Sequence, residues 1–122
     1  MTVVLLALAG GLGSALRFVL DGALSAASRR RYPVGTTVIN LVGSFVLGLL
    51  TGLVASRLLG PAGLLVLGTG LVGGFTTFST AAYETVRLVE QRRWGAALVH
   101  GLGQVVVATA LAGFGYLVGA GA

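Results

Sequence analysis

The sequence predicts an all-α integral membrane protein, a single domain over residues 1–122 that contains four transmembrane helices. Two observations lead to this prediction. The chain is 56% hydrophobic and only 9% charged, which is not the composition of a soluble domain. It also contains four apolar segments, each long enough at about 20 residues to cross a bilayer as a helix. The expected spans are residues 2–24, 34–56, 62–88 and 95–119.

The first span, MTVVLLALAGGLGSALRFVLDGALSAA, lacks a basic region at its start, and its apolar run continues past Arg17. Both features distinguish it from a secretory signal peptide, so we expect it to be retained. Short polar turns, SRRRYP, SRLLGPAG and EQRRWG, separate the four spans. Neighbouring helices should therefore run antiparallel and pack as one bundle. Few residues lie outside the spans, so any function must be carried out inside the bilayer.

The arginines are unequally divided between the two sides of the membrane. Loops one and three, which share a side, carry Arg29, Arg30, Arg31, Arg92 and Arg93, with Arg87 close by. Loop two carries Arg57 alone. The positive-inside rule places the arginine-rich loops in the cytoplasm and both termini outside. Although the net charge is +5, the chain has no lysine and no basic stripe interleaved with aromatic residues, so nucleic acid is not an expected partner.

Small residues recur four positions apart within the spans, a spacing that lets helix backbones approach closely. The chain has 21 glycines. The pairs at this spacing are Gly10/Ser14, Ser44/Gly48, Gly48/Gly52 and Gly115/Gly119. Helix packing alone accounts for most of them.

Polar side chains inside the first two spans are candidates for function. A charge such as that of Arg17 costs at least about 2.5 kcal/mol inside a bilayer unless it is paired, hydrated or able to reach the surface. Asp21, four residues later, is its expected partner. An ion pair within the helix and an anion-attracting vestibule both remain open. Asn40, in the second span, suits either an anion site or a contact between helices.

The third span contains the strongest signal, GLVGGFTTFST. Gly73 and Gly74 are poor helix formers, and Thr76 and Thr77 can bond backbone groups that a broken helix would free. An unbroken helix with glycines for packing is the alternative. A break inside a membrane is tolerated where it is buried or lines a wet cavity, and its carbonyls can hold a cation. A break here therefore predicts an ion site.

Polar groups continue beyond the predicted break. Phe78 offers a positive ring edge, which is a weak anion partner, and Ser79 and Thr80 offer hydroxyls. Glu84 follows Thr80 by four residues on the same helix face.

The fourth span carries His100 and Gln104, also four residues apart, and a contact between helices is their simplest role. The chain has no cysteine, so disulfides, thiolate metal sites and cysteine nucleophiles are excluded. Its single histidine cannot by itself form a histidine metal cluster. No nucleophile–base pair is visible either, so an enzyme is not expected.

Three segments together resemble the Fluc/CrcB family of fluoride channels: GGLGSALRF, YPVGTTVINLVGSFVLG and GLVGGFTTFST. The resemblance covers essentially the whole chain. It implies a plasma-membrane channel that exports fluoride from the cytoplasm by passive permeation. It also implies a dual-topology dimer of two antiparallel subunits, with two pores at their interface. In such a dimer, a central sodium ion holds together the third helices, each broken in mid-membrane.

The resemblance also assigns roles to individual residues. They are the sodium-ligand carbonyls of Gly73 and Thr76 in a break at Gly73 to Thr76, the pore residues Asn40 and Phe78, the hydroxyl track of Ser79 and Thr80, the vestibule residues Thr36 and Glu84, and the first-helix Arg17. The chain departs from the family pattern at two positions. Ala81 replaces a common second Phe, which could weaken or silence one pore. Gln104 replaces a common Ser but still offers donors, so it stays in the expected fluoride pathway.

The arginine asymmetry leads to a further hypothesis, because a homodimer inserted in both orientations should show little bias. This subunit would be fixed in one orientation and pair with an oppositely oriented paralogue. Two other functions stay open. A small multidrug-type proton-coupled exporter needs a titratable group deep in the membrane, whereas Asp21 and Glu84 lie toward the span ends. A non-conducting assembly subunit needs only glycine faces, which leaves Asn40 and the hydroxyl track unexplained.

Overall fold

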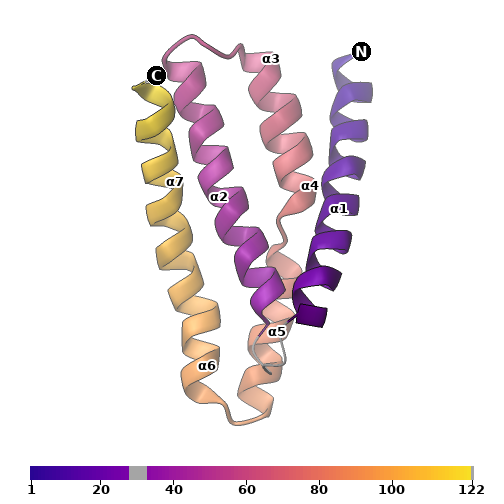
Figure 1. Cartoon of the computed structure of the whole chain (residues 1–122), viewed down its shortest axis with the longest axis vertical. Coiled ribbons are helices and arrows are strands. Elements are labelled where there is room, and N and C mark those ends of the chain that lie inside the picture. The colour runs from indigo at the N-terminus through magenta and orange to yellow at the C-terminus, as the bar shows by residue number, and fades with distance from the viewer. Residues whose placement is uncertain (28–32, 122) are drawn as a thin grey trace.

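The computed structural model describes residues 1–27 and 33–121, which form four helical rods and contain no strand (Figure 1). The first two rods are α1 (Thr2–Ala27) and α2 (Val34–Ala55). The third consists of α3 (Pro61–Gly63), the π-helix η1 (Leu64–Val72), α4 (Gly73–Phe75) and α5 (Phe78–Glu90). The fourth consists of α6 (Trp94–Leu98), the π-helix η2 (Val99–Gly103) and α7 (Gln104–Ala120).

All four rods are long and apolar enough to cross a membrane, which confirms the predicted all-helical, four-span class. They cover Thr2–Ala26, Val34–Ala55, Pro61–Glu90 and Trp94–Ala120. The π-helical segments within the third and fourth rods were not expected from the sequence. In η1 the hydrogen bonds reach back five residues, as from the Gly73 N–H to the Gly68 carbonyl. Such segments widen a helix and are frequent at functional sites.

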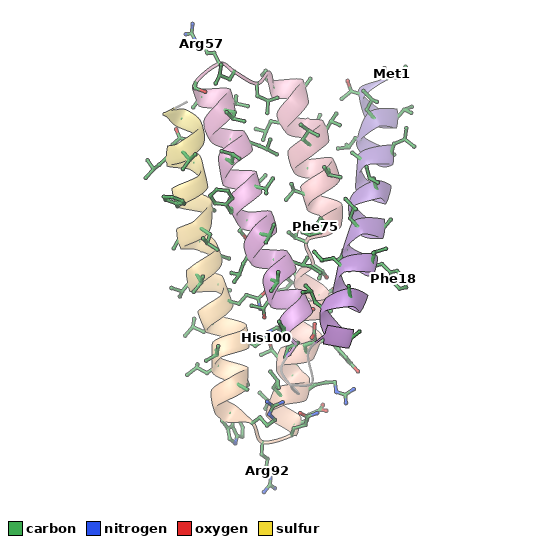
Figure 2. The ribbon with its side chains drawn as sticks, in the orientation of Figure 1. Met1, Phe18, Arg57, Phe75, Arg92 and His100 are labelled. Carbon is green, nitrogen blue, oxygen red and sulfur yellow. The ribbon has the colours of Figure 1, made fainter. Side chains whose placement is uncertain are left out.

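Both chain termini and the turn between α2 and α3 lie at one end of the bundle, and the turn between α5 and α6 lies at the other (Figure 1). Figure 2 accordingly places Arg57 and Met1 at one end and Arg92 at the opposite end. Arg29, Arg30 and Arg31, which complete the predicted arginine-rich side, lie outside the described residues. The described arginines keep the predicted asymmetry, since Arg87 and Arg93 flank the same turn as Arg92.

Arginine occupies the left-handed position in both of these turns, with φ values of 64° at Arg57 and 56° at Arg92. After α2, the Leu58 N–H returns to the Leu53 carbonyl at 2.9 Å, so the last carbonyls of the helix are paired. The turn at Arg92 repeats this pattern. Each helix thus ends with its backbone satisfied within a few residues.

Glycines bring the rods into backbone contact, as the four-residue spacing predicted. Along the interface of α2 with α7, a Cβ added to any of four glycines would overlap a facing backbone carbonyl. These glycines are Gly48, Gly52, Gly115 and Gly119. On the other side of the bundle, a Cβ on Gly13 would overlap the Leu71 carbonyl, and one on Gly74 would overlap that of Gly10. The third rod is therefore held against α1 as closely as α2 is held against α7.

Candidate functional site

The third rod is interrupted between α4 and α5. Thr76 has φ −82° and ψ 161°, and Thr77 has φ −148° and ψ 122°, so both residues are extended. Gly73, where the sequence predicted the break to begin, has the helical values φ −60° and ψ −40°. The extended residues are thus the threonines, and of the two glycines before them Gly74 serves close packing against α1 instead.

Asn40 on α2 pairs with both backbone groups of Thr77. Its Oδ1 accepts from the Thr77 N–H at 2.9 Å, and its Nδ2 donates to the Thr77 carbonyl at 2.8 Å. The same Nδ2 donates to Oε1 of Gln104 on α7, also at 2.8 Å. One side chain therefore replaces the hydrogen bonds that Thr77 would make in a continuous helix, and an unmade bond in this setting would be costly.

The interruption redirects the N–H groups that would otherwise bond two carbonyls. In a continuous helix the Thr77 N–H would donate to the carbonyl of Gly73, but here it donates to Asn40. The Thr80 N–H would donate to the carbonyl of Thr76, but it donates to Thr77 Oγ1 at 3.2 Å. The two carbonyls expected to bind sodium are therefore released from helical bonding, and carbonyl oxygens suit a hard cation. Among residues 1–27 and 33–121, no group of three or more His, Cys, Asp or Glu side chains could hold a metal instead.

Two side chains from α1 reach the last turn before the interruption. Ser14 Oγ donates to the Gly74 carbonyl at 3.2 Å, and Arg17 Nε donates to the same oxygen at 3.3 Å. The expectation that Arg17 pairs with Asp21 is therefore wrong. The carboxylate of Asp21 instead lies against Gly35 at the start of α2. The C-terminal carbonyls of a helix carry partial negative charge, which explains why the guanidinium turns toward them.

The hydroxyls after the interruption form a local cluster around Thr77. Its Oγ1 donates to Thr80 Oγ1 at 3.1 Å and lies 3.5 Å from Ser79 Oγ. Nearby, the Thr36 hydroxyl on α2 donates to the carboxylate of Glu84 on α5, so the structure joins the two expected vestibule residues. Thr77 belongs to the site through both its backbone and its side chain. The sequence pointed to its capacity to bond free backbone groups but not to this central position.

A second polar cluster lies between α2 and the fourth rod. His100 is only 1% exposed, and its position between the helices is visible in Figure 2. Gln104 Nε2 donates to the His100 carbonyl at 2.9 Å and lies 3.2 Å from His100 Nδ1. Thr37 Oγ1 lies 3.2 Å from the same ring nitrogen. The expected contact between helices is present, and Thr37 is a member that the sequence reading missed.

These elements enclose a groove of about 700 Å³. Its lining includes five of the expected site residues, Asn40, Gly73, Thr76, Phe78 and Gln104, together with Thr77 and His100. Other expected residues, Arg17, Thr36, Ser79, Thr80 and Glu84, are not part of this lining. Phe78 is 85% exposed, so its ring stands at the open side of the groove. Ala81, where the family pattern commonly has a second ring, also lines the groove.

Four membrane-length helices, an interrupted third rod and a mainly apolar groove whose polar members are amides, hydroxyls and one histidine define a polytopic membrane protein with polar groups inside its bundle. The chain belongs to the CrcB family, because the family model described as "CrcB-like protein, Camphor Resistance (CrcB)" matches residues 4–116.

Curated relatives are similar along most of the chain. The Fluoride-specific ion channel FluC 1 of Leifsonia xyli subsp. xyli is 50% identical over 98% of this chain and 87% of its own length. The FluC 2 protein of Mycolicibacterium paratuberculosis is 48% identical over 93% of this chain and 86% of its own length. FluC of Magnetococcus marinus is 42% identical and covers 98% of both chains. Membership of this family of ion channels confirms a multi-pass protein of the plasma membrane that is not an enzyme.

Replacing Asn40 with leucine should destabilise the fold by about 2–5 kcal/mol, because both backbone groups of Thr77 would lose their partner. Equilibrium unfolding of the purified protein in detergent would measure this change. Thr51→Val is the matched control, since the Thr51 hydroxyl is bonded only to its own helix, at the Leu47 carbonyl. This control should change stability by less than about 0.5 kcal/mol. Equal stability of the two variants would contradict the bridging role of Asn40.

Proposed function

We propose that this protein is a fluoride-selective channel that exports fluoride from the cytoplasm by passive permeation through pores at a dimer interface. The observation that carries the proposal is the 50% identity, over 98% of the chain, to a relative named Fluoride-specific ion channel FluC 1. The other two relatives described above carry the same function in their names.

The chemistry of the groove supports an anion of this kind. Fluoride is small and strongly hydrated, so a pathway must replace its water with hydrogen-bond donors. Asn40 and Gln104 place amides there, Thr77 places a hydroxyl and Phe78 a ring edge, and an anion would gain the N–H and O–H groups by displacing their partners within the protein. No arginine, aspartate or glutamate is among the described residues that line the groove. Neutral donors attract fluoride without the strong fixed charge that would prevent its release.

Other expected pathway residues would act beside the groove. Ser79 and Thr80 continue the hydroxyls from Thr77, and Thr36 with Glu84 forms a polar contact between α2 and α5. Arg17 would not contact fluoride itself. Its guanidinium donates to the carbonyl of Gly74, so it would act by holding the end of α4 in place.

A test of the function compares two exposed phenylalanines. In liposomes that contain this chain, with its paralogue added where the unmodified chain is silent alone, Phe78→Ile should reduce fluoride efflux to the level of protein-free vesicles, because the ring edge at the groove is lost. Phe18 on α1 is the matched control: it is 82% exposed, against 85% for Phe78, and it does not line the groove. Phe18→Ile should therefore conduct like the unmodified chain. A fluoride electrode reads efflux, with chloride as the control ion. Unchanged efflux in Phe78→Ile would remove this ring from the pathway.

The proposed dimer contains a second subunit in the opposite orientation, which covers the open side of the groove. The large exposure of apolar side chains that line it supports this, with Phe78 at 85% and Val105 at 59%. The proposal further places a sodium ion between the interrupted rods of the two subunits, held by the carbonyls of Gly73 and Thr76. Support comes from the redirected N–H groups of Thr77 and Thr80, which leave these oxygens for another partner.

Removing sodium should weaken the dimer, because the carbonyls of two subunits would face one another without a cation between them. Size-exclusion chromatography with light scattering in detergent measures the dimer fraction as the protein is diluted. Sodium chloride is compared with potassium and choline chloride at equal ionic strength. Dissociation should begin at higher protein concentration in potassium and choline. The same dimer fraction in all three salts would rule out a structural sodium ion.

The arginine asymmetry supports a subunit fixed in one orientation, which would require an oppositely oriented paralogue as its partner. Single cysteines placed beside Arg57 and beside Arg92 report orientation, since the chain has no cysteine of its own. In intact cells, an impermeant thiol reagent should label the position beside Arg57 and spare the one beside Arg92. Equal labelling at both positions would indicate both orientations and a homodimer.

The alternatives differ from this proposal in what purified protein would do. The name shared by the relatives does not favour a proton-coupled exporter. A non-conducting assembly subunit would be silent in liposomes alone and also when its paralogue is added. A heterodimeric channel would be silent alone and would conduct with the paralogue.

A further inference from the structure

His100 lies at the end of a chain of hydrogen bonds whose direction is set by the backbone of Thr77. A backbone N–H only donates and a carbonyl only accepts, so the Asn40 amide must place Oδ1 at the Thr77 N–H and Nδ2 at the Thr77 carbonyl. The Nδ2 of Asn40 then donates to Gln104, which must present its oxygen, Oε1. The nitrogen of Gln104 consequently points away from Asn40.

That nitrogen reaches His100. Gln104 Nε2 donates to the His100 carbonyl at 2.9 Å and lies 3.2 Å from ring Nδ1. An amide nitrogen donates and does not accept, so Nδ1 must present its lone pair. The ring is therefore neutral and carries its hydrogen on Nε2. The backbone of the interrupted rod thus determines the tautomer of a buried histidine on another rod.

This arrangement occupies the donors of Asn40. Nδ2 has two hydrogens, and they are directed at the Thr77 carbonyl and at Gln104 Oε1, each at 2.8 Å. The bond to Thr77 holds the interrupted backbone. An anion in the groove can thus gain an N–H from Asn40 only when Gln104 withdraws its oxygen.

The Thr37 hydroxyl can form a hydrogen bond with the His100 ring whether or not Nδ1 carries a hydrogen. Its Oγ1 lies 3.2 Å from His100 Nδ1 and 3.2 Å from the carbonyl of Pro33. When the hydroxyl donates to Pro33, its oxygen can accept a hydrogen from Nδ1. The hydroxyl can also turn and donate to Nδ1. Thr37 can therefore serve a ring with or without a hydrogen at that atom.

We propose that His100 is a positioning residue that controls, through Gln104, whether Asn40 offers an N–H group to an anion in the groove. When Nδ1 takes up one proton from solution, its N–H faces the N–H of Gln104, and the Gln104 amide must turn or withdraw. Either movement takes Oε1 away from Asn40 and frees one N–H. The inference rests on the proposed function and adds proton-linked control to it.

Other titratable groups near His100 are few in the described part of the chain. α2 and α6 carry no charged side chain, and α7 carries Tyr116 as its one titratable residue. α5, which packs against η2, carries Tyr83, Glu84, Arg87 and Glu90. Arg87 Nη1 lies 3.5 Å from the Tyr83 hydroxyl, and Glu84 accepts from Thr36, the neighbour of Thr37. Glu84 is therefore the group whose titration must be separated from that of His100.

The experiment uses the fact that His100 is the only histidine. In ¹⁵N-histidine-labelled protein in lipid, the ring should carry its hydrogen on Nε2 at pH 8. At a fixed lower pH, sodium fluoride should raise the protonated fraction relative to sodium chloride, because linkage between the two sites is reciprocal. Efflux at pH 5 should exceed that at pH 8, because a ring as deeply buried as His100 takes up a proton only in acid. Protein-free vesicles measured at each pH correct for the passage of HF through lipid.

Variants separate positioning from a merely structural role. His100→Asn keeps an acceptor near the place of Nδ1 but cannot titrate, so it should conduct as the unmodified chain does at pH 8 and lose the dependence on pH. Glu84→Gln should keep the ratio of efflux between the two pH values. A hydrogen on Nδ1 at pH 8, a protonated fraction indifferent to fluoride, or an unchanged pH profile in His100→Asn would overturn the inference while the channel still conducts. Failure to conduct, alone and with a paralogue, would overturn the proposed function.

Discussion

The pairing of Asn40 with the backbone of Thr77 is the interaction on which the site depends. Inside a bilayer an unpaired N–H or carbonyl costs several kcal/mol, because no water can replace the missing partner. The two extended residues of the third rod lose helical partners for their backbone groups. For Thr77, the Asn40 amide replaces these partners with two hydrogen bonds. Gly43, almost one turn further along α2, provides the space, since a Cβ there would overlap the Thr76 methyl group. The Asn40 amide and the absence of a side chain at Gly43 together allow α2 to pack directly against the interrupted segment of the third rod.

The opposite side of the interruption is held by α1. Gly10 lies so close to Gly74 that a Cβ on Gly74 would overlap its carbonyl, and Ser14 and Arg17 both bond the Gly74 carbonyl. The end of α4 is therefore fixed by backbone contact and by two donors from α1, while the start of α5 is fixed by α2. Because the two halves of the third rod are anchored to different helices, the extended threonines between them keep a defined geometry.

Composition and length were enough to predict the four spans, since the physical requirement for crossing a bilayer is itself one of length and polarity. The polar groups in those spans were also recognisable, because each is costly in that setting. Their partners were not. The bonds of Asn40 with Gln104 and of Arg17 with Gly74 join residues far apart in sequence, so they depend on how each helix is rotated about its axis. Local spacing suggested Asp21 for Arg17, and only the packed bundle shows otherwise.

The position of the interruption illustrates the same limit. Glycine propensity pointed to Gly73, yet the extended residues are the threonines that follow, and Thr77 is held in this conformation by Asn40, 37 positions earlier in the chain. This placement also has an electrostatic consequence. Arg17, the charge deepest in the first rod, lies against the carbonyl end of α4, and the other described arginines lie toward the ends of the bundle. Most of the groove lining is apolar, and its polar members are amides, hydroxyls and one buried histidine, so the strength with which it holds an anion depends on how many N–H groups its own hydrogen bonds leave available.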